Sequence, residues 1–115
     1  MNNTELTMYK NYPAILSFFR EVEEQDRKSA KRYALSVINE YNKDLKGFVG
    51  VVAYKHDNTW HLATGLIVRI IKSIRREYLK RVDSSVRLNG IEKDWLKNYI
   101  IARYREEVNP FIGQA

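Results

Sequence analysis

Apolar residues return at helical spacing in four stretches of this chain. In residues 13–24 they step by three and four along one face, and Pro13 suits the first turn of a helix, where its missing N–H needs no partner. In residues 27–45 the same stepping marks a second helix. Its expected buried stripe comprises Ala30, Tyr33, Ala34, Val37, Ile38 and Tyr41.

The most regular pattern lies in residues 59–82, where apolar residues repeat every four positions from Leu62 to Tyr78. This repeat predicts a long helix whose buried face is centred on Leu66, Ile70 and Ile74.

A fourth helix is expected over residues 91–108, with two overlapping apolar rows. The rows include Trp95, Leu96, Tyr99 and Ile100. Because one small bundle is not expected to bury both rows, the pattern favours a homodimer.

The connections between these stretches contain residues that commonly end or start helices. Asp26 is a natural N-cap for the second helix, and Gly47 a plausible stop. Residues 48–54 are rich in β-branched side chains, so we expect a short connector or turn over 48–58, with a hairpin as the alternative. Pro110 should end the last helix, because proline disfavours a helical residue before it.

The predicted fold class is all-α: a compact bundle of four main helices in a single domain that spans residues 1–115. Residues 1–12 are expected to form a partly ordered arm, and residues 111–115 a short tail. The chain has 115 residues, two prolines, five glycines and no cysteine. These counts leave room for one core, argue against a turn-rich β architecture, and exclude disulfides and thiolate metal sites.

Positive charge is concentrated on two of the predicted helices. The chain carries +6 overall, with +4 in residues 27–46 and +5 in residues 59–82, whereas residues 13–26 carry −3. In the long helix the cations follow steps of three and four, and Glu77 is the only acid. A row of this kind can contact successive phosphates, which supply most of the affinity of nucleic-acid-binding proteins.

We therefore expect a non-enzymatic regulatory protein that binds the phosphate backbone of nucleic acid. The candidate contact residues are Arg69, Lys72, Arg75, Arg76 and Lys80 of the long helix, and Arg27, Lys28 and Lys31 of the second. One alternative is that the row is a solvated helix face without a ligand. In another, the first helix packs alongside and its acids neutralise the row. Others are a protein-interaction module of the inhibitor or immunity type, with an acidic partner, and a peripheral protein at an anionic membrane.

The remaining reactive side chains do not predict a catalytic, metal or cofactor site. His56 and His61 are five residues apart, whereas a helical metal site needs spacings of three or four. The acids Glu21, Glu23, Glu24 and Asp26 are more typical of a solvated or ion-paired face. Most tyrosines and tryptophans lie at core spacing, with Trp60 and Tyr104 expected to be the most exposed.

The sequence shows neither a targeting signal nor an apolar run of the length that spans a bilayer, so a cytoplasmic protein is expected. Abundant Lys, Asn, Ile and Tyr favour an AT-rich coding sequence from a bacterium, phage or plasmid. In size, basicity and helix count the chain resembles the small helical proteins of bacterial mobile elements.

Overall fold

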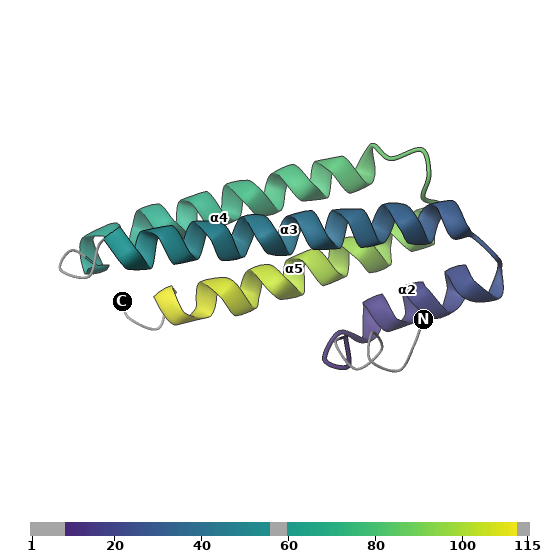
Figure 1. Cartoon of the computed structure of the whole chain (residues 1–115), viewed down its shortest axis with the longest axis horizontal. Coiled ribbons are helices and arrows are strands. Elements are labelled where there is room, and N and C mark those ends of the chain that lie inside the picture. The colour runs from purple at the N-terminus through teal and green to yellow at the C-terminus, as the bar shows by residue number, and fades with distance from the viewer. Residues whose placement is uncertain (1–8, 56–59, 113–115) are drawn as a thin grey trace.

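The structure is a computed structural model that describes residues 9–55 and 60–112, with side chains described over 9–46 and 68–109. This part of the chain forms helices α2 (Pro13–Glu24), α3 (Lys28–Lys55), α4 (Trp60–Asp83) and α5 (Gly90–Ile112) (Figure 1). The expected all-α bundle of four main helices is confirmed.

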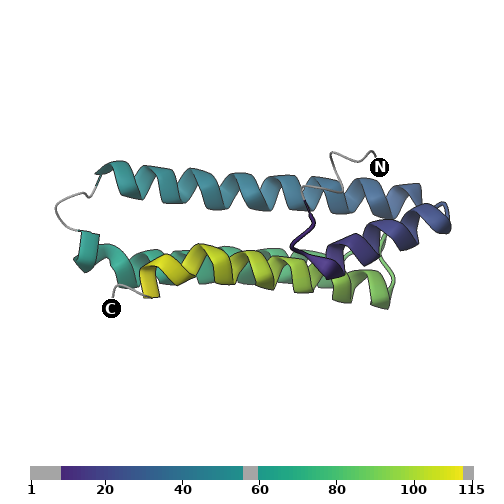
Figure 2. The ribbon, with the colours of Figure 1, turned by 90° about the horizontal axis from the view of Figure 1, so that it is seen from below.

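The three long helices lie side by side, and the short α2 covers one end of them. α4 packs against both α3 and α5, whereas α2 packs against α5 and α3. Figure 2 shows α3 on one side of the α4–α5 pair, with α2 beside the beginning of α3. The molecule is elongated, with extents of 51 × 30 × 20 Å.

α2 has the predicted bounds, but Asp26 is not the N-cap that we expected. Its φ of 53° places it in the left-handed region. The N–H of Arg27 donates to the carbonyl of Val22 at 2.8 Å, and the N–H of Asp26 to that of Glu23 at 3.2 Å. This pair of bonds is the Schellman ending of a helix, in which the left-handed residue is usually glycine. Asp26 therefore serves the end of α2 rather than the start of α3.

α3 ends ten residues later than predicted. It continues through Gly47 and residues 48–54 to Lys55. The alternative of a hairpin is therefore wrong over 48–55, and the expected connector or helical turn is there part of one continuous helix. Residues 56–59 lie outside the described residues. Helix propensities of β-branched residues fall only tenths of a kcal/mol below those of good helix formers, and extending an existing helix needs no new nucleation.

α5 also passes its predicted end, because it includes Asn109 and Pro110 and runs to Ile112. The expected tail therefore begins later than residue 111. Proline removes one backbone hydrogen bond, but the lost bond lies in the last turns, where it interrupts little of the helix.

The buried side of α4 follows the predicted four-residue repeat only at Tyr78, and the expected burial of Ile70 and Ile74 is wrong. Ile71, Tyr78 and Val82 are buried, whereas Ile70 and Ile74 are only half-buried; the side chain of Leu66 lies outside the described residues. α4 packs against both α3 and α5, so its buried line runs where these two neighbours meet it. Arg75 falls on that line and interrupts the apolar pattern in the sequence.

Both apolar rows of α5 find partners within the chain. Tyr104 and Val108 lie on the side that meets α4, and Tyr99 lies beneath Tyr9 and Tyr12, with ring centroids 6.1 and 5.0 Å away. Tyr9 also stacks on Phe19 of α2 at 5.6 Å. The two rows reflect a central position in the bundle, so they no longer argue for a second copy of the chain.

A fully buried carboxylate joins the beginnings of α3 and α5. Glu92 accepts hydrogen bonds from Arg27 Nε at 2.5 Å and from Arg27 Nη2 at 2.7 Å. It also accepts the N–H of Asn89 at 2.8 Å, while Asn89 Oδ1 accepts the N–H of Glu92 at 2.9 Å. The second pair of bonds is a capping box at the start of α5. Arg27 further donates to the carbonyl of Arg87 at 3.2 Å, which fixes the loop before α5.

Replacing Asp26 by glycine should stabilise the protein. Glycine adopts a φ of 53° without the steric penalty of a Cβ, and the contact that Asp26 makes with Lys28 is long, at 3.8 Å, and exposed. We expect Asp26→Gly to raise the free energy of unfolding by about 0.5–1 kcal/mol in chemical denaturation. Gln25→Gly, one residue earlier with an ordinary φ of −94°, should give no gain. A loss of stability in Asp26→Gly would contradict the assigned helix ending.

Truncating Ile71 should destabilise the protein more than truncating its neighbour Ile70. Ile71→Ala is expected to lower the free energy of unfolding by about 2–5 kcal/mol, because it opens a cavity in the core. Ile70→Ala should cost clearly less, since Ile70 is half-buried. Urea denaturation of both variants measures the difference, and equal losses would show that the buried line is misassigned.

Glu92 should make stability depend on pH. Burial raises its pKa, but the hydrogen bonds from Arg27 and from the backbone of Asn89 outweigh burial, so that the pKa lies below its ordinary value. Its stabilisation is therefore present above the unfolded-state pKa of about 4.3, and it is lost as the pH falls through the lower folded-state pKa. At pH 7, Glu92→Gln should cost about 2–3 kcal/mol, and the difference from the wild type should shrink below about pH 4.

The control for this prediction is Asp94→Asn on the same helix. The exposed carboxylate of Asp94 lies 3.9 Å from Lys97, so its loss should change the unfolding free energy by less than about 0.5 kcal/mol. A difference between wild type and Glu92→Gln that stays constant from pH 7 to pH 3 would refute the role of the Glu92 charge.

Candidate nucleic-acid interface

Four of the predicted contact residues form one exposed strip along α4. Arg69, Lys72, Arg76 and Lys80 are all exposed, and we call these four residues the α4 basic face. They span eleven residues, or about 16 Å of helix. The ion pairs of α4 with other described residues use Arg81 and Asp83 instead. Within the described part of the chain, the α4 basic face therefore has no acidic partner.

Glu77, one of the two acids of α4, pairs with Arg81 rather than with the α4 basic face. Glu77 Oε1 lies 3.8 Å from Arg81, and Arg81 in turn pairs with Glu40 of α3 at 2.5 Å. These contacts place Glu77 on the edge of α4 that faces α3. Glu77 follows Arg76 and is three residues before Lys80, but no ion pair joins it to either of them among the described residues.

The acids of α2 do not lie alongside the α4 basic face. α2 packs on α5 and α3, and its Glu23 pairs with Lys31 at 2.9 Å. Glu21 accepts a hydrogen bond from Gln25 within the same turn of the chain. The acids of α2 therefore do not neutralise the α4 basic face, as they would if α2 packed alongside it.

α5 adds a cation that the sequence analysis missed. Arg75 faces Tyr104 across the antiparallel α4–α5 pair, and the next residue of each helix turns about 100° out of that contact. In an antiparallel pair both turns lead to the same side, so Arg76 and Arg105 emerge together, and both are exposed. Residues 91–108 carry no net charge, so the charge of this segment did not indicate Arg105 as a contact residue.

Arg75, the fifth candidate on α4, lies half-buried beside the strip. Its guanidinium carbon is 4.2 Å from the centroid of the Tyr104 ring. Tyr104 is only 8% exposed, so the expectation that it is among the most exposed aromatics is wrong; the side chain of Trp60 lies outside the described residues. Tyr41, Tyr78 and Tyr99 are likewise core residues rather than a stacking surface.

The other three candidates, Arg27 just before α3 and Lys28 and Lys31 in its first turn, each lie next to an acid. Arg27 is bound by Glu92, and Lys31 by Glu23. Lys28 is 3.8 Å from Asp26 and is highly exposed. The structure thus separates these three residues from the α4 basic face, in their position as well as in their pairing.

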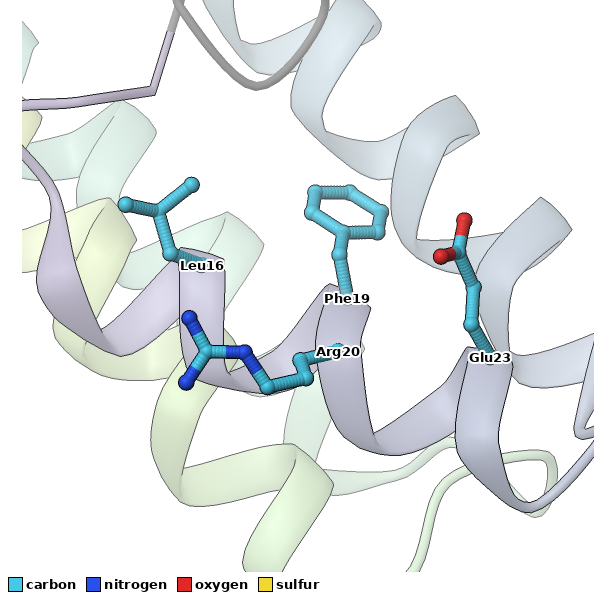
Figure 3. A pocket seen from close by; sticks show the side chains of 4 residues that line it. All are labelled: Leu16, Phe19, Arg20 and Glu23. Carbon is cyan, nitrogen blue, oxygen red and sulfur yellow. The ribbon is translucent and has the colours of Figure 1, made fainter. Parts of the chain in front are cut away.

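Two hollows flank the Glu23–Lys31 ion pair. One, of about 150 Å³, is lined by Leu16, Phe19, Arg20 and Glu23 (Figure 3). The other, of about 280 Å³, is lined by Lys28, Lys31, Arg32 and Leu35. Their described lining includes one carboxylate, Glu23, and that group is already ion-paired, so neither hollow offers a pair of groups for acid–base catalysis.

A second polar cluster surrounds Arg103, and its charged and polar groups bind one another. Arg103 pairs with Glu106 and Glu107 at 2.7 Å each, and its Nε donates to Asn42 at 3.1 Å. Tyr12 donates to Glu106 at 2.7 Å; burial, together with this bond, raises the pKa of Tyr12 to about 12. The cluster holds the start of α2 and the middle of α3 against α5, which is a structural role.

The described residues contain no group of three or more metal-ligating side chains. His56 and the side chain of His61 fall outside that part of the chain. None of the helices, over the described residues, is long and apolar enough to cross a membrane.

Comparison of the chain with protein-family profiles, with curated proteins and with solved structures gave no match. The functional reading of this protein therefore rests on its own residues and their geometry.

Proposed function

We propose that this protein binds nucleic acid through its phosphate backbone, without catalysing a reaction, and that the α4 basic face makes the contact. The observation that carries the proposal is the exposure of Arg69, Lys72, Arg76 and Lys80 along one edge of α4, with no ion pair to an acid in the described part of the chain. The two acids of α4, Glu77 and Asp83, pair with Arg81 and Lys97 instead. A regulatory role in the cytoplasm of a bacterium, or of a phage or plasmid host, completes the proposal and rests on composition alone.

The spacing of the cations supports contact with a phosphate backbone. Steps of three and four residues advance about 4.5–6 Å along a helix, so successive side chains can reach successive phosphates of one strand. Arg105 widens the positive surface toward α5. Contacts of this type position a protein on nucleic acid but do not by themselves read its sequence.

A protein-interaction module remains the second candidate, and a different part of the molecule favours it. Val86 is 98% exposed in the loop between α4 and α5, and Ile91 is 62% exposed at the start of α5. Leu88 is buried between them, and the Arg87 carbonyl is held by Arg27, so the loop presents Val86 from a fixed position. Such exposed apolar side chains suit contact with another protein.

Neutralising the α4 basic face should remove salt-sensitive binding. If each of its four cations contacts one phosphate, the log–log slope of affinity against salt should be steeper by about 3.6 on duplex DNA, which corresponds to about a 150-fold loss between 50 and 200 mM salt. Changing Arg69, Lys72, Arg76 and Lys80 together to Gln should flatten the slope by that amount. Salt titrations on duplex DNA, single-stranded DNA and RNA provide the measurement.

The matched control changes Lys10, Arg20, Lys43 and Lys46 to Gln. These side chains are also exposed, and the substitution lowers the net charge by the same amount, from +6 to +2. Equal slopes for the two quadruple variants would show that net charge, not the α4 basic face, controls binding. No binding by the wild type at low salt would leave the protein-interaction candidate ahead.

A further inference from the structure

Among the stacked arginines of the described residues, Arg75 is half-buried and is not bound by an acid. Its guanidinium lies over Tyr104, and its Nε is buried without a hydrogen-bond partner. Arg81 provides the comparison on the same helix: it lies over Tyr78 at 4.5 Å, but it pairs with Glu40 and Glu77. Arg87 is 5.9 Å from the Tyr33 ring and is exposed. Arg75 is thus the half-buried, stacked arginine that no acid of the described residues binds and whose Nε has no hydrogen-bond partner.

The position of Arg75 places its guanidinium beside the α4 basic face. Arg75 is three residues after Lys72 and next to Arg76, so it lies at the edge of the α4 basic face. The Tyr104 ring covers one face of the guanidinium, which limits rotation of its plane. A planar guanidinium presents paired N–H groups that match two oxygens of a phosphate, and holding the plane reduces the ordering needed on binding.

We propose that Arg75 grips one backbone phosphate of the bound nucleic acid with paired N–H groups, while Tyr104 holds its guanidinium in place. The inference rests on the proposed function. Lys72 and Arg76 then act as point charges toward neighbouring phosphates. In this arrangement Arg75 orients one phosphate, and the exposed cations supply the long-range attraction.

A substitution that conserves charge tests this division of roles. Arg75→Lys keeps the positive charge but loses the planar pair of donors, whereas Arg69→Lys makes the same exchange at an exposed position. At a fixed low salt concentration we expect Arg75→Lys to weaken binding of a defined oligonucleotide about tenfold, and Arg69→Lys less than twofold. The salt slope should be the same for both variants and the wild type, because the number of charges is unchanged.

A spectroscopic readout does not depend on how well a variant folds. The Nε–H of Arg75 is buried, so its ¹H–¹⁵N signal should be observable in the wild type and should shift when the oligonucleotide is added. The signal of Arg81, whose guanidinium is bound by acids, should not shift. A stationary Arg75 signal under saturating oligonucleotide would overturn the inference.

The outcomes also separate this inference from the proposed function. If the wild type binds with a steep salt slope but Arg75→Lys matches Arg69→Lys, Arg75 is an ordinary cation, and only the inference fails. If the wild type does not bind DNA or RNA at low salt, the proposed function fails and the inference falls with it. If Arg75→Lys alone loses affinity at an unchanged slope, both stand.

Discussion

The arrangement of the bundle depends on one buried ion pair, Arg27–Glu92. A carboxylate removed from water is strongly destabilising unless charged and hydrogen-bonding groups replace the solvent. Here Arg27 and the backbone of Asn89 supply those groups. The pair sets where α3 and α5 begin relative to each other, and it closes the capping box of α5. Through the Arg87 carbonyl it also fixes the loop that joins α4 to α5.

Ion pairing inside the bundle divides the cations into two groups. Arg27, Lys31, Arg81 and Arg103 each connect helices or turns to an acid nearby. The α4 basic face does not connect α4 to another helix, because α3 and α5 pack against the other sides of α4. A surface of unpartnered cations therefore results from the way the acids are used elsewhere, and the overall charge of +6 understates how uneven the surface is.

Sequence periodicity predicted the helices well but not the details that depend on neighbours. α2 and the exposure of Arg69, Lys72, Arg76 and Lys80 followed from spacing, since both depend on a single helix. The buried line of α4 did not, because the half-buried Arg75 packs on Tyr104, a residue 29 positions later. For the same reason nothing in the local sequence distinguished Arg27, which binds Glu92, from the exposed Lys28. The ends of α3 and α5 were missed because turn-forming residues are weak signals inside a helix that packing supports.

The ion pair between Arg27 and Glu92 also sets the order in which the molecule can be completed. The two residues are 65 positions apart, so at synthesis rates of about 5–20 residues per second Arg27 leaves the ribosome about 3–13 s before its partner. During that interval α2 and α3 can pair through Glu23 and Lys31, but nothing holds them at the angle they take in the bundle. Because α5 packs against α2, α3 and α4, the contacts of the bundle are complete only after α5 has been synthesised. A nascent chain without α5 lacks the carboxylate that Arg27 binds in the finished protein.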